Sequence, residues 1–408
     1  MKTGFLIFIE SNTSGTGRLF AKAACKLGYR PILLVDDPRR YEFLKQDSVS
    51  YVQCDTSSQS SVAAEIAVLQ SQGPIAGIFS SSEYFIEVAA SLAAANGLQG
   101  ESPAALRNCR NKSIQRQQLR KADLRTPRFE CVNTAQAAIL SLQRIPLPVI
   151  VKPTMGSGSV GVRLCSSTTE VADHASALLQ KKVNERGLPL PEEVLIEEYL
   201  IGPEFSVEIL GQAALGITRK YVSPEPFFVE LGHDFPAGLS REIAEDMITV
   251  AQSGLRSLGL GWGPAHVEMR LTSDGPTIIE INPRLAGGFI PEIVRLALGI
   301  DVIRETIKLV AGEPVDVRPS HHSSASIRFF TPVENGVITA IQGVEEAAAM
   351  QGIVDIQTYR RVGDHVGIKN DFRDRIGHVI SHSELEISAA NLSEAARTKI
   401  SFTVQAQA

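Results

Sequence analysis

The first hundred residues alternate short apolar runs with segments in which apolar residues recur every three or four positions. The apolar runs have the length of buried strands, and the periodic segments have helical spacing. The expected strands are Phe5–Ile9, Pro31–Val35 and Ile75–Phe79, and the expected helices are Gly17–Leu27, Val62–Gln70 and Ile86–Asn96. This alternation predicts a doubly wound parallel sheet, covered by helices, at the start of the chain.

Two later runs, Ala265–Leu271 and Pro276–Ile281, have strand composition and flank the turn-forming segment Ser273–Gly275. They predict a β-hairpin with a three-residue loop and the glycine in the left-handed position. This register places Glu268 opposite Glu280. Opposed residues of an antiparallel pair project from the same face of a sheet, so we expect the two carboxylates to lie together.

Asn282 lies two residues beyond Glu280 and is expected on the same face. Two carboxylates and an amide oxygen on one face repel each other unless a cation lies among them, and hard oxygen ligands suit Mg²⁺. The alternative is the solvent-facing side of an edge hairpin. The residues that follow favour the metal site, because Arg284 and the segment Ala286–Gly288 add a fork of cationic donors and a bare backbone, as in sites of phosphate chemistry.

A lysine and a glycine-rich segment accompany another apolar strand, Val149–Pro153. A buried lysine such as Lys152 needs an anion to meet it. The backbone N–H groups of the loop Met155–Val162 can close over phosphates, although a flexible hairpin turn has the same composition. A P-loop is excluded because no Gly-Lys-Ser/Thr follows. Two further strands, Val194–Leu200 and Gly202–Glu208, are separated by a short hinge whose backbone can hydrogen-bond to an adenine.

The turn after the first strand resembles a dinucleotide-binding fingerprint without completing it. Ser14–Gly17 follows the strand and Asp36 ends the next one, but Phe20 occupies the position where close helix–strand packing needs glycine or alanine. We therefore expect an ordinary strand–turn–helix here rather than a nicotinamide or flavin site. Glu83 follows the third expected strand, at the edge where ligands of such sheets bind; it can hold a substrate ammonium or simply favour the helix dipole.

Composition limits the classes of partner. The chain has 408 residues, 44% of them hydrophobic, a formal net charge of −5 and a pI near 6.0, which gives no support to a nucleic acid or an anionic membrane as partner. The cysteines are odd in number and never in Cys-x-x-Cys spacing, so neither a disulfide framework nor a zinc site is indicated and we expect a cytoplasmic location. No apolar run approaches the ~18 residues of a membrane span, so we expect a soluble protein.

Five motifs in order resemble the ATP-grasp superfamily. They are Lys112, V-I-V-K-P with its glycine loop, I-E-E-Y-L-x-G-P-E-F-S, H-V-E-M-R and I-I-E-I-N-P-R, and the resemblance covers Arg107 to about Gly312. One departure is Asn111, which stands where the family often has an acid. Within the superfamily, I-E-S-N-T-S-G-T-G, the segment Phe228–Ala237 and N-P-R-L-A-G-G are similar to the L-amino-acid (dipeptide) ligases, which are carboxylate–amine ligases.

The resemblance implies roles for individual residues. The nucleotide would be held at its phosphates, adenine and ribose by Lys112, Lys152, Ser157, Gly158, Ser159, Glu197, Glu198, Leu200 and Glu204. The ligands of Mg²⁺, or of Mn²⁺ as an alternative ion, would be Glu268, Glu280 and Asn282. The catalytic residues would be Arg284 and Gly288, and the substrate-binding residues Glu83, His233 and Gly287.

The resemblance also implies domains, a reaction and partners. We expect an N-terminal α/β domain over 1–105, an ATP-grasp domain over 106–312 with two α+β subdomains sandwiching ATP and a lid near 153–162, and a small α+β cap over 313–408. The implied reaction joins a carboxylic acid to an amine, with an amino acid among the substrates, through an acyl phosphate with release of ADP and phosphate. Relatives of this kind are usually homodimers. The alternatives are another ATP-grasp enzyme, such as a carboxylase subunit or a purine-pathway ligase, or a nucleotide-binding module without chemistry.

Overall fold

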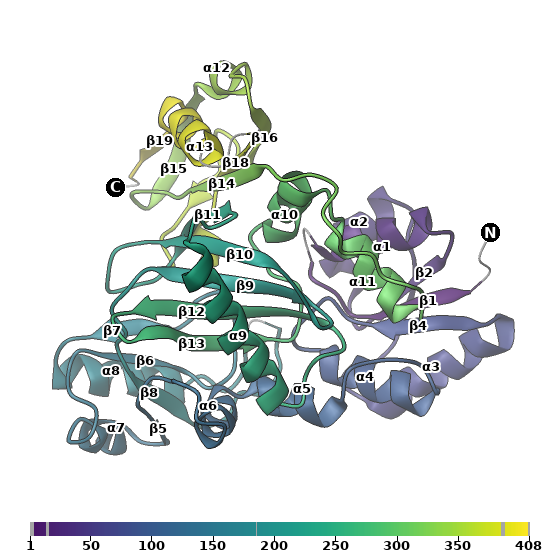
Figure 1. Ribbon diagram of the computed structural model, residues 1–408, viewed down its shortest axis with the longest axis horizontal. Helices are drawn as coiled ribbons and strands as arrows, with labels where there is room; N and C mark the ends of the chain where they lie inside the picture. Colours follow the sequence, from purple (N-terminus) through teal and green to yellow (C-terminus); the bar gives the residue numbers. More distant parts are fainter. Residues whose placement is uncertain (1–3, 14–15, 185, 385–387, 407–408) are drawn as a thin grey trace.

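The computed structural model describes residues 4–13, 16–184, 186–384 and 388–406. Within them the chain forms a parallel four-stranded sheet near its beginning, a large sheet of eight strands, a second four-stranded sheet and a three-stranded sheet. Figure 1 shows the N-terminal unit beside the large sheet, with the C-terminal elements above that sheet. Among the described residues, no helix is long and apolar enough to cross a lipid bilayer.

The N-terminal sheet is parallel, has the order β3-β2-β1-β4 and carries helices on both faces. Its strands are β1 (Phe5–Ile9), β2 (Arg30–Val35), β3 (Ser50–Gln53) and β4 (Ile75–Phe79). Odd-numbered residues of β1 pack on α3 (Gln59–Gln72) and α4 (Ile86–Ala95), and even-numbered ones on α1 (Thr16–Lys26), α2 (Glu42–Gln46) and α11 (Val302–Val310). In Figure 1, α11 lies beside α1 although it comes from much later in the chain. The doubly wound parallel sheet is confirmed.

The sequence pattern missed one strand of this sheet. β3 is an edge strand with mainly exposed side chains, so it lacks the apolar run by which the other strands were recognised. Glu83 therefore follows the fourth strand of the chain rather than the third. Two residues of the turn that resembles a dinucleotide fingerprint, Ser14 and Gly15, lie outside the described residues. Phe20, which follows that turn, is buried against Phe8 and Phe79.

The large sheet is antiparallel and has the order β13-β12-β9-β10-β11-β14-β18-β16. One face of β9, β12 and β13 packs apolar side chains against α9 (Arg241–Ser257), which leaves the polar residues of these strands on the other face. The strands are β9 (Glu204–Leu210), β10 (Ala213–Val222), β11 (Glu230–Phe235), β12 (Pro264–Thr272), β13 (Gly275–Asn282), β14 (Ser324–Phe330), β16 (Ile353–Thr358) and β18 (Gly377–Ser383).

The hairpin β12–β13 has Glu268 opposite Glu280, as predicted. The predicted three-residue loop is wrong, because Thr272 pairs with Gly275 and leaves only two residues between the strands. A β-bulge at Ile279 inserts one extra residue into β13 and restores the expected register before Glu280. The carboxylates therefore meet through a shorter turn and a bulge, a combination that turn chemistry alone does not predict.

The second four-stranded sheet, here called the small sheet, has the order β5-β8-β6-β7 and is antiparallel. Its strands are β5 (Phe129–Val132), β6 (Val149–Pro153), β7 (Arg163–Cys165) and β8 (Val194–Glu198). Helices α7 (Ala135–Ser141) and α8 (Thr168–Leu179) close its own core. Before it come α5 (Pro103–Arg110) and α6 (Lys112–Lys121). The small and large sheets agree with the two α+β subdomains that the sequence resemblance implies.

The C-terminal residues are shared between two sheets. Strands β14, β16 and β18 extend the large sheet, because β14 pairs with β11 and continues it. A separate sheet of order β17-β15-β19 lies beside them. The remaining elements are η1 (Pro38–Arg40), α10 (Ile290–Leu298), β15 (Gly336–Gln342), α12 (Val344–Ala348), β17 (His365–Val366), η2 (Phe372–Asp374), α13 (Ser388–Lys399) and β19 (Ser401–Gln405).

Candidate active site

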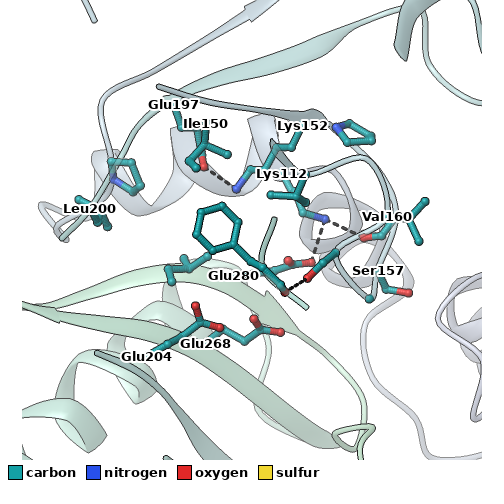
Figure 2. Close-up of a pocket in the computed structure, with 18 of the residues that line it drawn as sticks. Lys112, Ile150, Lys152, Ser157, Val160, Glu197, Leu200, Glu204, Glu268 and Glu280 are labelled. Carbon is teal, nitrogen blue, oxygen red and sulfur yellow. Dashed lines mark hydrogen bonds and ion pairs between the residues drawn. The ribbon is translucent and has the colours of Figure 1, made fainter. Parts of the chain in front are cut away.

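A cavity of about 880 Å³, including space open to solvent, lies between the small sheet and the polar face of the large sheet. Figure 2 shows Lys152 and Glu197 on one side of it and Glu204 and Glu268 on the other. The predicted residues that line it are Lys112, Lys152, Ser157, Gly158, Ser159, Glu197, Glu198, Leu200, Glu204, Glu268 and Glu280. The predicted residues outside its lining are Glu83, His233, Asn282, Arg284, Gly287 and Gly288.

A cationic wall, which we define as the cavity-lining Lys112 and Lys152 together with the fully buried Arg116, holds more positive than negative charge beside the small sheet. Lys152 and Arg116 are both buried and share the carboxylate of Glu197, with Arg116 Nε 2.7 Å from Glu197 Oε1. Burial lowers the pKa of Lys152, and the shared Glu197 offsets this only in part. Because one carboxylate cannot neutralise two buried cations, this wall is suited to an anion.

Lys112 joins this wall to the hairpin. It is the first residue of α6, and Asn111 caps that helix by accepting hydrogen bonds from two backbone N–H groups of the first turn. The Lys112 ammonium donates to Gly156 O at 2.7 Å and lies 2.9 Å from Glu280 Oε1. Burial alone would lower the pKa of Lys112, but the carboxylates of Glu280 and Glu83 outweigh it and raise the pKa. Lys112 thus remains charged beside the glycine loop.

An acidic wall, defined as Glu204, Glu230, Glu268 and Glu280, lies opposite on the large sheet. The first three converge on the ammonium of Lys220, at 3.1, 2.9 and 2.8 Å respectively. Burial would lower the pKa of Lys220, but these carboxylates raise it well above its usual value. Glu204 and Glu230 also pair with Arg270 and Arg375, at 3.5 and 2.5 Å respectively. Glu268, which lies opposite Glu280, is therefore the carboxylate of this group best suited to a further cation.

The sequence interpretation missed Lys220 and Glu230. Lys220 belongs to no motif, and Glu230 lies in the segment Phe228–Ala237, in which only His233 was given a role. Their meeting depends on pairing across three strands, since Lys220 on β10 lies opposite Glu204 on β9 and beside β11. Alternation along β10 could have placed Lys220 on the polar face, but the order of the strands was needed to identify its partners.

The metal-binding prediction rests on Glu268, Glu280 and Asn282. Glu268 lies 3.4 Å from both His266 Nε2 and Asn282 Nδ2, and Lys220 and His266 keep the pKa of its carboxyl low despite burial. Among the described residues no three histidine, cysteine or acidic side chains form a ready metal cage. Mg²⁺ in nucleotide sites is usually held by one or two carboxylates together with phosphate oxygens. The opposed glutamates and the neighbouring amide therefore fit a metal that arrives with a nucleotide.

The glycine loop covers the cavity and touches both neighbouring units. Ser159 Oγ donates to Phe228 O at 2.9 Å, across the cavity from the small sheet. Gly158 O accepts from Phe372 N at 3.3 Å, and a Cβ on Gly158 would lie 2.5 Å from the Phe372 ring. Gly158 also has a φ of 66°, so a larger residue is disfavoured there both by the backbone and by space. The loop is thus held closed by contacts with the C-terminal region.

The hinge between β8 and β9 borders the cavity at the end expected to hold adenine. Leu200 O accepts a hydrogen bond from Arg270 Nη1 at 2.6 Å, and the Arg270 guanidinium lies over the rings of Tyr199 and Phe228. Glu198 pairs with Arg128 at 3.1 Å. These contacts hold the Leu200 backbone beside the aromatic rings of Tyr199 and Phe228, which also line the cavity. The sequence interpretation missed Arg270, although it belongs to the H-V-E-M-R motif.

Glu83 and Arg284 meet beside the acidic wall. Arg284 Nη2 and Nε lie 3.0 and 3.1 Å from Glu83 Oε2, and both side chains are largely buried. Burial would lower the pKa of Arg284, but the carboxylates of Glu83, Glu280 and Glu268 outweigh it and raise the pKa. The structure therefore brings these two predicted residues together, but as counterions of each other. A zwitterionic substrate would have to exchange with this pair.

His233 and Gly288 form a second contact between predicted substrate residues. His233 is fully buried, and neither ring nitrogen has a hydrogen-bond partner in the described part of the chain. A Cβ on Gly288, whose φ is 58°, would lie 2.5 Å from His233 Nε2, so only glycine leaves room for the ring. Burial lowers the pKa of His233 to about 3 and keeps the ring neutral. Gly287, the preceding residue, accepts from the N–H of Ile290 at the start of α10.

Comparisons with known proteins agree with this geometry. Residues 145–292 match the ATP-grasp domain family, and residues 328–405 match L-amino acid ligase C-terminal domain 2. The uncharacterized protein y4rH of Sinorhizobium fredii is 36% identical over 399 residues, which cover 98% of this chain and 83% of that protein. The alanine–anticapsin ligase of Bacillus subtilis is 26% identical over 286 residues, which cover 64% of this chain and 59% of that ligase.

The fold has a close counterpart among solved structures. The L-amino acid ligase from Bacillus licheniformis superimposes with a TM-score of 0.80 at 21% identity, over 98% of this chain and 99% of the other. At that identity the likeness shows the fold alone, whereas the two family matches lie on the sequence that builds the cavity and the C-terminal region. The chain therefore belongs to the ATP-grasp ligases, as a carboxylate–amine ligase of the L-amino acid ligase type.

Proposed function

We propose that this ligase joins the carboxylate of one amino acid to the amine of another, through an acyl phosphate and with release of ADP and phosphate. The observation that supports this most directly is the charge division of the cavity between the cationic wall and the acidic wall. ATP carries anionic phosphates together with a divalent cation, so a cleft with one wall of each sign accommodates both.

In the first step a carboxylate oxygen of the acyl substrate attacks the γ-phosphorus of ATP. A new acyl–O–P bond forms, the bond from the γ-phosphorus to the bridging oxygen breaks, and ADP leaves. Lys112 and Lys152 lie where they can neutralise the charge of the phosphates. A bound Mg²⁺, held by Glu268, Glu280 and Asn282, would add further neutralisation of the phosphate charge.

In the second step the amine attacks the acyl carbon, gives up a proton, and phosphate leaves with the electron pair of the former acyl–O bond. Arg284 and the backbone near Gly287 and Gly288 are the donors available to an oxyanion at that carbon. Acyl phosphates react with water, so the glycine loop acts as a lid that excludes it, and the contacts of Ser159 and Gly158 support this role.

The choice of an amino acid rests on the Glu83–Arg284 pair. A planar guanidinium suits a carboxylate or an acyl phosphate, and a nearby carboxylate suits an ammonium. A free α-amino acid carries both groups and can replace each partner of the pair at once. The Glu83–Arg284 pair is then replaced by two pairs, the substrate ammonium with Glu83 and the substrate carboxylate with Arg284, and no buried charge is left unpaired. A substrate with only one charge would leave one of the two residues without a partner.

A screen of amino-acid pairs with ATP and Mg²⁺ tests this function. Phosphate release, separation of ADP from AMP and mass spectrometry of the product should show ADP, phosphate and a dipeptide or similar amide. AMP with pyrophosphate would exclude the acyl phosphate. Turnover only with bicarbonate or a nucleotide precursor would instead move the chain to another branch of the superfamily.

A further inference from the structure

We propose that Arg375, which comes from the C-terminal region, binds the α-carboxylate of the amino acid that serves as the amine. This inference rests on the proposed function and identifies which residue would bind the amino acid that supplies the amine. The sequence interpretation assigned no role to Arg375, and the side chain lies outside the lining of the nucleotide cavity.

The Arg375 side chain is oriented by two fixed contacts. Its Nη2 lies 2.5 Å from Glu230 Oε2 and its Nε donates to Glu230 O at 3.2 Å, so one edge of the guanidinium is bound to β11. The guanidinium also stacks over the Phe329 ring, with its central carbon 3.9 Å from the ring centroid. The side chain is only 12% exposed, so these contacts hold a charged group in a defined place.

The other edge of the guanidinium remains available. Within the described residues, Nη1 has no hydrogen-bond acceptor, and it lies 3.6 Å from where a Cβ of Gly288 would be. His233, whose ring nitrogens lack partners in the same described residues, lies against the same bare glycine. A cationic donor without an acceptor and a neutral imidazole thus both lie close to Gly288, which belongs to the proposed acyl site.

The chemistry of the reaction requires a second carboxylate-binding group. The acyl substrate loses its free carboxylate when the acyl phosphate forms, but the amine substrate keeps its own throughout and the dipeptide retains it. Arg284 is already paired with Glu83, and Lys220 already contacts three carboxylates. Arg375 is the cation near Gly288 that has an unused donor edge, so it suits this carboxylate.

The segment that carries Arg375 is rigid and also touches the lid. Asp374 accepts from the N–H groups of Lys369 and Asn370 at 2.7 and 2.8 Å, which fixes the turn before Arg375. Phe372 of the same segment packs on Gly158. The acceptor site and the closed lid are therefore built on the same short piece of chain.

The test compares an amino-acid acceptor with its α-carboxamide, which has the same amine but no carboxylate. In Arg375→Met we expect the KM for the amino acid to rise roughly 10- to 100-fold, the range for loss of a charged hydrogen bond, while the KM for the carboxamide stays within about twofold of wild type. Arg375→Lys should recover part of the loss. Arg360→Met removes an exposed arginine of the same region and should resemble wild type.

Hydroxylamine, an amine without a carboxylate, separates activation from acceptor binding. Arg375→Met should still form the acyl hydroxamate at near wild-type rate, which also shows that the variant is folded. Equal losses with the amino acid, the carboxamide and hydroxylamine would overturn the proposal and assign Arg375 to phosphoryl transfer or to folding. If wild-type protein forms neither hydroxamate nor dipeptide with any amino acid, the proposed function itself is wrong.

Discussion

The proposed nucleotide half of the site and the proposed substrate half, called the nucleotide half and the substrate half below, are assembled in different ways. The nucleotide half uses residues that lie close together in short motifs, such as Lys152 with its glycine loop and Glu280 with Asn282. The substrate half uses residues from distant parts of the chain, such as Glu83 with Arg284, and Arg375, which reaches it from the C-terminal region. The phosphates of ATP are common to all ATP-dependent reactions, whereas the acyl and amine substrates differ from one enzyme to another. The substrate half can therefore change while the nucleotide half is kept.

The charge balance of the two halves differs as well. In the nucleotide half the ions are shared unequally, with two cations on Glu197 and three carboxylates on Lys220. In the substrate half Glu83 and Arg284 form a matched pair. An unequal arrangement favours a charged ligand, and a matched pair favours a ligand that replaces both charges. Variants in each half should therefore fail in different measurements.

The largest effect is expected for Glu280→Gln. This change removes one of the two opposed carboxylates and should lower kcat/KM roughly 10²- to 10³-fold for every acceptor, the range for loss of one group that stabilises charge in the transition state. The melting temperature should stay close to wild type, because glutamine keeps an oxygen that can accept from Lys112 and the change also removes the repulsion between Glu280 and Glu268. Glu345→Gln, on an exposed helix, is the control. Undiminished phosphate release in Glu280→Gln would remove this residue from the metal site.

The next effect is expected for Arg284→Lys. Lysine keeps the charge but cannot reproduce the planar fork that Arg284 presents to Glu83, so kcat/KM for the amino-acid substrates should fall roughly 10- to 100-fold. Glu83→Gln should weaken amino-acid use more than ATP binding. Initial rates with amino acids and with ATP varied in turn check this, and equal losses in both KM values would end the distinction between the two halves.

Lys152→Ala should abolish most of the thermal stabilisation by ATP and Mg²⁺. A ligand that binds only the folded state stabilises it by about 2.7 kcal/mol at a concentration of 100 Kd, and loss of the lysine should raise Kd and shrink this effect. Lys121→Ala, an exposed lysine on α6, should keep it. A wild-type shift with NAD but none with ATP would contradict the assignment of the whole nucleotide half.

The smallest effect concerns acid stability. The pKa of His233 falls to about 3 in the folded chain, where burial outweighs the attraction of Glu230 and where Arg375, Lys220 and His266 also oppose its charge. In the unfolded chain the ring takes up a proton below its ordinary pKa near 6.5, whereas in the folded chain it stays neutral. The free energy of unfolding is therefore highest with respect to this group at neutral pH, and it decreases as the pH falls below 6.5. Between pH 7 and pH 5 wild type should lose about 2 kcal/mol more than His233→Asn. Denaturant unfolding at both pH values measures this; equal pH dependence in the two proteins would mean that His233 does not govern it.

The same contrast explains how much could be predicted from the sequence. Helix and strand periodicity identified the parallel sheet and the hairpin, because both signals are local. The opposition of Glu268 and Glu280 followed from strand pairing even though the turn was predicted one residue too long. Lys220 and Arg375 could not be found, since each acquires its partners through strand order or through packing of the C-terminal region, which no local pattern encodes.

The large sheet has a practical consequence for the C-terminal region. Strand β11, which begins with Glu230 and contains His233, pairs with β14 from Gly232 to Phe235. Removing residues 313–408 would turn β11 into an edge strand with unpaired backbone N–H and C=O groups, which are templates for aggregation. Truncated or chimeric enzymes should therefore keep the chain at least through β18, which ends at Ser383 and lies between β14 and the edge strand β16, rather than be cut at the boundary suggested by the sequence.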